Sequence, residues 1–126
     1  MIKHIGLQVK AKDIPLFYEK ILGGKKGRSF VLTETDAKNI FNFHTRVDVI
    51  YIRAEGVNFE LFVDENTPSK SFTHICLTHR NAERVFIEAR QAGFWTHLRQ
   101  KAGGASKTYF IRDNNQNLFE IKQAQS

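Results

Sequence analysis

The sequence is poor in cysteine and has no long apolar run. Cys76 is the only cysteine among 126 residues, so no internal disulfide is expected and a reducing compartment suits the chain. No run of 18 or more apolar residues is present, which argues against a membrane-spanning helix. The first residues lack the charged head, apolar middle and cleavage site of a secretory signal. We therefore expect a cytoplasmic protein with no membrane partner.

What the chain does contain is enough apolar material for one core. Hydrophobic residues make up 41% of the sequence, and 11 of them are phenylalanines. The net charge is +6, from 19 basic and 13 acidic residues. No helix-turn-helix or aromatic-basic signature accompanies that charge, so we interpret it as a solvated surface and expect no nucleic-acid partner.

Alternating apolar and polar residues indicate a chain rich in β-structure. The alternation predicts strands near residues 2–9, 26–34, 45–54, 57–64, 72–78, 94–101, 106–112 and 117–123. Two helices are predicted between them. The first lies in KDIPLFYEKILGG, with Asp13 as its N-cap and the glycine pair at 23–24 as its end. The second, at about 80–92, begins at Asn81 and ends at Gly93.

This order is an internal repeat: βαβββ, a polar linker DENTPSKS, and βαβββ again. KHIGLQV in the first half matches THICLTH in the second, FYEKILGG matches FIEARQAG, and NFELFV matches LFEIKQ. Each module is too small to close a core alone, so the two must pack together or exchange with a partner chain. We predict a single domain over 1–126, with module 1 at about 1–66 and module 2 at about 71–126.

A histidine opens each module and a glutamate lies on the last strand of each. These residues are His4 and Glu60 in module 1, and His74 and Glu120 in module 2. By strand alternation, all four leave the face opposite to the more apolar one. Each of them alone is more often a solvated residue, but four in matched positions predict a shared site. Two imidazoles and two carboxylates suit a divalent metal ion.

These residues carry a resemblance to a known family. HIGLQV, FYEKILGG, FELF, THICL and FIRDNNQNLFEI, in this order, resemble the vicinal oxygen chelate superfamily. That superfamily includes glyoxalase I, fosfomycin-resistance enzymes, methylmalonyl-CoA epimerase, extradiol dioxygenases and bleomycin-binding proteins. The resemblance implies an α+β fold in which two βαβββ modules form a curved, barrel-like mixed sheet with helices on its outer face. It also implies a homodimer.

The resemblance further implies a metal-dependent lyase or isomerase of the glyoxalase type. His4, Glu60, His74 and Glu120 match the four metal-ligand positions of glyoxalase I, and the ion would be Zn, Ni, Co, Mn or Fe. The substrate would be a small carbonyl compound or thiol adduct that reacts through a metal-stabilised enediolate. Glu120 is the first choice for the catalytic base and Glu60 the second. Whether the ligands meet within one chain or across a dimer stays open.

Two positions depart from the glyoxalase I pattern. Gln8 stands where an arginine usually holds a glutathione carboxylate, and Asp64 stands where an asparagine is usual. A negative charge at position 64 would repel that carboxylate, so we do not expect a standard glutathione glyoxalase. The predicted metal face also supplies candidate substrate-binding residues: Gln8, Phe62, Asp64, Cys76 and Thr78.

Other functions of the same fold remain alternatives. An epimerase or a fosfomycin-type thiol transferase or hydrolase is one, although fosfomycin enzymes tend to carry a tyrosine where this chain has Phe110. A non-catalytic binder of small molecules is another. Two further residues are expected inside the protein, Cys76 as a small buried hydrophobe and Trp95 in the core.

Overall fold

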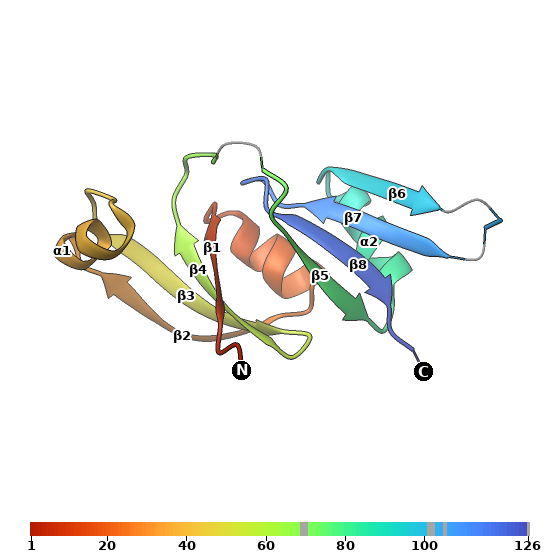
Figure 1. Cartoon of the computed structure of the whole chain (residues 1–126), viewed down its shortest axis with the longest axis horizontal. Coiled ribbons are helices and arrows are strands. Elements are labelled where there is room, and N and C mark those ends of the chain that lie inside the picture. The colour runs from red at the N-terminus through yellow and green to blue at the C-terminus, as the bar shows by residue number, and fades with distance from the viewer. Residues whose placement is uncertain (69–70, 101–102, 105, 126) are drawn as a thin grey trace.

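The strands form two four-stranded sheets that lie one beside the other in Figure 1. The computed structural model describes residues 1–68, 71–100, 103–104 and 106–125. The first sheet has the order β1-β4-β3-β2, with β1 (Ile5–Val9), β2 (Lys25–Leu32), β3 (Val47–Ala54) and β4 (Val57–Val63). The second has the order β5-β8-β7-β6, with β5 (His74–His79), β6 (Thr96–Gln100), β7 (Lys107–Arg112) and β8 (Leu118–Gln123).

The two sheets repeat the same topology and the same register. In each, the first and last strands of the module pair in parallel and the remaining neighbours are antiparallel. Gly6 is the register partner of Glu60, and Cys76 is the register partner of Glu120. The predicted α+β class and the βαβββ repeat are therefore confirmed. The linker predicted at 64–71 connects the sheets, although its residues 69–70 lie outside the described part of the chain.

The two predicted helices are present, and a third was missed. The two helices that match the sequence pattern are η1 (Ile14–Ile21) and α2 (Ala82–Gln91). The hydrogen bonds of η1 are of the wide i to i+5 kind. A short helical segment, α1 (Glu34–Asp36) continued by η2 (Ala37–Phe41), follows β2 directly. The Thr33 side chain caps it by accepting a hydrogen bond from the Asp36 amide.

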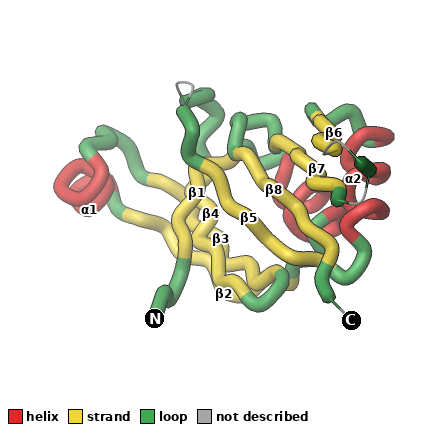
Figure 2. Tube along the Cα trace, turned by 45° about the vertical axis from the view of Figure 1, so that its right-hand side comes forward, coloured by secondary structure: helices red, strands yellow, loops and turns green. Residues whose placement is uncertain are grey.

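A single apolar cluster lies between the modules and holds them together. Helix η1 occupies the middle of the molecule, and α2 covers one face of the second sheet (Figures 1 and 2). The Phe17 ring of η1 packs edge-on against Phe94 at 5.1 Å and lies 5.6 Å from the Phe119 ring. Phe59 of the first sheet reaches the same Phe119 ring at 6.2 Å. Both modules thus bury aromatic area against each other.

A buried polar network reinforces this contact. The turn between β7 and β8 carries Asp113, whose Oδ2 accepts a hydrogen bond from the Tyr18 hydroxyl at 2.7 Å. Asn115 and Asn117 on the same turn both donate side-chain hydrogen bonds to the carbonyl of Gln8, at 2.8 and 2.7 Å. Burial raises the pKa of Asp113, and burial followed by the Asp113 charge raises the pKa of Tyr18.

Asp13 has a different role from the predicted helix cap. It stands at the N-cap position of η1, but its side chain makes no hydrogen bond to that helix. Instead, its two carboxylate oxygens accept hydrogen bonds from the backbone amide and the side-chain amide of Asn114, both at 2.6 Å. The carboxylate therefore joins the modules, because a charged acceptor binds two donors of a buried turn more strongly than one helix amide.

No described helix is long and apolar enough to cross a membrane.

Candidate metal centre

The first sheet places one histidine beside one glutamate. His4 immediately precedes β1 and Glu60 lies on β4, and the parallel pairing of these strands brings them to the same face. His4 Nε2 lies 3.3 Å from Glu60 Oε1. The glutamate side chain is 11% exposed and the imidazole 46% exposed, so the carboxylate is held in the sheet surface while the ring stays open to a ligand.

The second sheet repeats this pair. His74 begins β5, Glu120 lies on β8, and His74 Nε2 is again 3.3 Å from Glu120 Oε1. Lys122 Nζ approaches the other oxygen of Glu120 at 3.6 Å. The sequence repeat is therefore a repeat of side-chain geometry as well as of strands.

The hydrogen bonding of His74 leaves its Nε2 ready to bind a cation. His74 Nδ1 lies 3.0 Å from the carbonyl oxygen of Phe72, which only accepts hydrogen bonds, so Nδ1 carries the proton. In the neutral ring, Nε2 then aims a lone pair at Glu120 Oε1, and either a proton or a metal ion between the two atoms satisfies both acceptors. A backbone carbonyl on the far nitrogen is also the usual outer partner of a metal-bound histidine. The donor chemistry therefore fits a divalent ion.

The two pairs do not join into one cluster within a chain. Among the residues that the structure describes, no group of three or more His, Cys, Asp or Glu side chains is arranged to hold a metal. A zinc-type site usually takes three or four protein ligands, so each pair alone offers too few.

Tyr51 is a site residue that the sequence analysis missed. It is the register partner of Glu60 on β3, and its hydroxyl donates a short hydrogen bond to Glu60 Oε2. That hydrogen bond is the main cause of a raised pKa for Tyr51, so the hydroxyl remains a donor at neutral pH. The repeat contained the signal, because YIR at 51–53 matches FIR at 110–112. In the second sheet, Phe110 is the register partner of Glu120.

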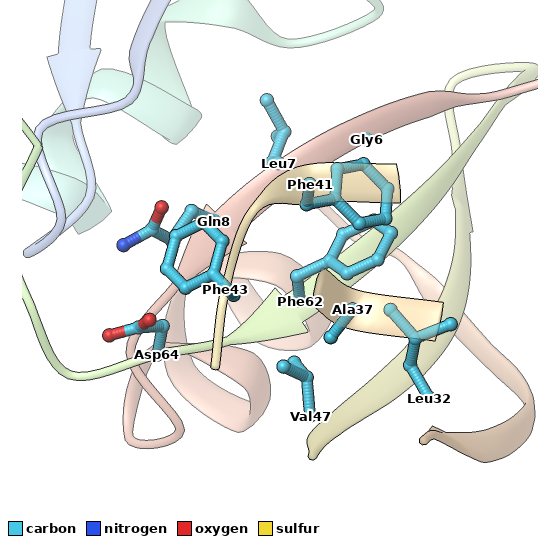
Figure 3. Close-up of a pocket in the computed structure, with 10 residues that line it drawn as sticks. All are labelled: Gly6, Leu7, Gln8, Leu32, Ala37, Phe41, Phe43, Val47, Phe62 and Asp64. Carbon is cyan, nitrogen blue, oxygen red and sulfur yellow. The ribbon is translucent and has the colours of Figure 1, made fainter. Parts of the chain in front are cut away.

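An apolar pocket lies on the first sheet (Figure 3), and Gly6, the register partner of Glu60, is part of its lining. Three of the predicted substrate-binding residues, Gln8, Phe62 and Asp64, line it. The full lining consists of Gly6, Leu7, Gln8, Leu32, Ala37, Phe41, Phe43, Val47, Phe62 and Asp64. Residues of the unpredicted η2 helix form one wall, so this pocket was not foreseeable from strand alternation alone.

The other two predicted substrate-binding residues, Cys76 and Thr78, lie on β5 outside this pocket, and both are exposed. The prediction of a buried Cys76 was wrong, because α2 packs against the opposite face of the second sheet and leaves this one open. Partial desolvation, followed by the charge of Glu120, raises the pKa of the thiol. Cys76 therefore stays protonated and is a poor nucleophile.

Trp95 was also misplaced by the sequence analysis. It is 49% exposed rather than part of the core, and the Arg112 guanidinium lies 5.1 Å from the centroid of its ring. This cation–π contact belongs to the open face of the second sheet. Arg99, Lys107 and Lys122 line a hollow beside Glu120 on the same face, so its surroundings are basic whereas the pocket of the first sheet is apolar.

Solved structures of known proteins resemble this architecture over nearly the whole chain. A fosfomycin resistance protein, FosX, from Listeria monocytogenes superposes with a TM-score of 0.74 at 14% identity, covering 99% of this chain and 93% of that one. A glyoxalase family protein from Enterococcus faecalis gives a TM-score of 0.69 at 17% identity, with 97% and 96% covered. FosX from Mesorhizobium loti gives 0.68 at 12% identity, with 99% and 92% covered.

This chain has the vicinal oxygen chelate fold. A complex of the Listeria FosX contains Mn(II) and sulfate, and a mutant of that protein was solved with Mn(II) and 1S,2S-dihydroxypropylphosphonic acid. No protein-family model and no curated protein sequence matches the chain. The likeness to structures below 20% identity establishes the fold alone, because one fold hosts many functions.

Proposed function

We propose that this protein is a metal-dependent lyase or isomerase of the glyoxalase type, acting on a small carbonyl compound or thiol adduct. The observation that carries this proposal is the duplicated pair, in which His4 faces Glu60 and His74 faces Glu120 at the same 3.3 Å separation. Random surface histidines would not repeat both the strand register and the nitrogen-to-oxygen distance. The Mn(II)-containing structures of FosX support a divalent ion as the cofactor.

In this proposal the complete site forms in a homodimer. His4 and Glu60 of one subunit meet His74 and Glu120 of the partner subunit across a two-fold axis, which creates two equivalent sites. The separation of the pairs within one chain supports this arrangement, because each pair alone offers only two ligands. The largely exposed imidazoles on both open faces are accessible to a second copy.

A divalent cation held by the four side chains supplies a Lewis acid that stabilises negative charge on a substrate oxygen. Glu120 is the base that takes a proton from the carbon beside the carbonyl and returns it to the neighbouring carbon. Glu60 is less suited, because the Tyr51 hydroxyl already binds its Oε2 and holds the carboxylate in place. Phe110 makes no such bond to Glu120, whose Oε2 has only the half-exposed Lys122 ammonium at 3.6 Å, so this carboxylate is held less firmly than Glu60.

A second candidate is a fosfomycin-type reaction, in which water or a thiol opens an epoxide on a phosphonate. Arg99, Lys107 and Lys122 beside Glu120 favour it, because a phosphonate needs cationic partners. The likeness to two FosX proteins also supports it. Phe110 speaks against it, since the tyrosine typical of that group is missing there.

The experiment that tests the proposed function combines metal analysis with a substrate panel. Purified protein, loaded with Zn, Ni, Co, Mn or Fe, is expected to keep one ion per chain, and His74→Ala is expected to lose it. The loaded protein is then assayed with hemithioacetals of several thiols and with fosfomycin. A metal-replete protein that binds no ion would rule out both enzymatic candidates and leave a non-catalytic binder.

A further inference from the structure

The apolar pocket adjoins the His4–Glu60 pair directly. Gly6 lines the pocket and is also the register partner of Glu60. One step further along the same face, Phe62 pairs with Gln8, and both line the pocket too. A molecule held at Glu60 therefore has the pocket as its nearest sheltered surface on the first sheet.

The lining offers no cationic partner to a ligand. Eight of the ten lining residues are apolar, and no lysine or arginine is among them. The rings of Phe41 and Phe62 meet edge to face, with centroids 5.1 Å apart, and form one end of the pocket in Figure 3. The polar ends of Gln8 and Asp64 lie at the other end, and the Asp64 carboxylate there would repel an anion.

The two polar side chains already have partners. The Gln8 amide donates to the carbonyl of Asn66 at 2.9 Å, and Asp64 accepts from the Asn66 amide at 2.8 Å. The Gln8 and Asp64 side chains therefore hold the loop after β4. The aromatic end of the pocket is the part that is available to bind a ligand. The cavity has a volume of about 200 Å³. An apolar cavity of about 150 Å³ is sufficient for benzene, so one ring or a branched alkyl group fits here.

We infer that this pocket binds an uncharged apolar substituent of the substrate, an aryl or branched alkyl group, and so determines specificity. The inference rests on the proposed function for the neighbouring reaction site, but the pocket itself is formed by residues of one chain. Its apolar character contrasts with the basic hollow beside Glu120 on the second sheet. The enzyme is therefore selective for substrates that carry such a group on the side of the reacting carbon that faces Gly6.

The first test needs no metal. Benzyl alcohol, a neutral aryl probe, is titrated into metal-free protein while backbone amide resonances are followed by NMR. We expect shifts centred on Gly6, Ala37 and Phe62. Phe41→Ala is expected to weaken binding at least about threefold through lost ring contact. Ile40→Ala is the matched control, because Ile40 lies on the same helix, is 64% exposed and does not line the pocket.

The second test uses metal-loaded protein and two metal-chelating probes, acetohydroxamic and benzohydroxamic acid, with affinities measured by calorimetry. Burial of the phenyl ring is expected to make benzohydroxamic acid bind about tenfold more tightly, and Phe41→Ala should remove most of this difference. Equal affinities in the wild-type protein would overturn the inference and leave the proposed metal site intact.

Two further outcomes separate the ideas. Protein that binds no metal but shows the benzyl alcohol shifts supports the pocket while the proposed function fails. Benzyl alcohol shifts at Gly6, Ala37 and Phe62 that disappear as the protein concentration is raised would show that a second copy fills the cavity in place of the probe, and this would overturn the inference.

Discussion

The Tyr51 hydroxyl donates a hydrogen bond to Glu60, whereas the equivalent position beside Glu120 is Phe110. The two glutamates match in strand, register and distance to a histidine, so this difference breaks the symmetry of the repeat, as does Lys122, which lies 3.6 Å from Glu120 Oε2. A carboxylate with a fixed donor on one oxygen keeps its orientation. Of the two glutamates, Glu60 is therefore the more firmly held and Glu120 the less firmly held. This difference suits a site in which one glutamate only binds metal and the other also moves protons.

Removing the Tyr51 hydroxyl should weaken metal binding. In Tyr51→Phe, Glu60 Oε2 loses its donor while Oε1 and His4 remain, and loss of such an outer partner typically lowers metal affinity 10–100-fold. Competition with a chelator of known affinity measures the change. Tyr109→Phe is the control, because Tyr109 is buried against Phe86 of α2 and should leave metal affinity unaltered. Equal losses in both variants would contradict a specific role for Tyr51.

Asp113 should make stability depend on pH. Burial raises its pKa above the ordinary value of 3.8, so between 3.8 and the raised value the folded protein binds more protons than the unfolded chain. The contribution of Asp113 to the free energy of unfolding therefore falls as the pH rises through that window. Asp113→Asn does not titrate, and it also places an amide where Asp113 Oδ2 accepts hydrogen bonds from Tyr18 and Asn117.

We expect Asp113→Asn to be less stable than wild type by about 1–3 kcal/mol, because buried donors lose an acceptor. The difference should be largest at low pH and shrink as pH rises, in urea unfolding measured from pH 4 to 7. Asp48→Asn, at an exposed position on β3, should change little over the same range. A stability difference for Asp113→Asn that is independent of pH would show that the carboxyl does not titrate in this window.

Strand alternation and the repeat were enough to predict both βαβββ modules and the faces on which His4 and Glu120 lie, but not the parallel pairing of the first and last strands of each module. Predictions from these two patterns failed where packing against a neighbouring element determines whether a residue is buried or what it contacts. The α1–η2 segment was missed because it is short and directly follows an alternating strand. Cys76 and Trp95 were placed inside because of their apolar character, whereas α2 covers only one face of the second sheet and both residues are exposed. Asp13 matched the pattern of a helix cap, and the pattern contains no information about Asn114, its partner 101 residues away.

The cap of α2 offers a direct measure of local stability. The Asn81 side chain accepts a hydrogen bond from the Arg84 amide, and Asn81→Ala should lower the free energy of unfolding by about 1 kcal/mol. Asn81→Ser keeps a capping oxygen and should retain most of the stability. Chemical denaturation of the three proteins provides the comparison. Identical midpoints for Asn81→Ala and wild type would mean that the cap does not contribute measurably to stability, because the first turn of α2 already frays.

Mixing two inactive variants should reveal whether the metal site is shared between chains. His4→Ala removes a ligand from the first module, and His74→Ala removes one from the second. In a two-fold dimer of the proposed kind, a mixed dimer contains one site that lacks both histidines and one site that lacks neither. Each variant alone should bind metal weakly, whereas the mixture should recover tight sites.

For random exchange at equal concentrations, half of the dimers are mixed and each has one intact site. The mixture should therefore regain about one quarter of the tight sites of wild type. The variants are unfolded together and refolded to exchange chains, and bound metal is measured after dialysis against a weak chelator. The fraction of mixed dimers after refolding is measured separately by native mass spectrometry, and His44→Ala, at an exposed position, serves as a control that should keep the tight sites of wild type after the same treatment. Because two defective chains can restore each other only if the ligands come from different subunits, recovery requires a shared site, and a mixture that binds no more metal than its components would rule one out.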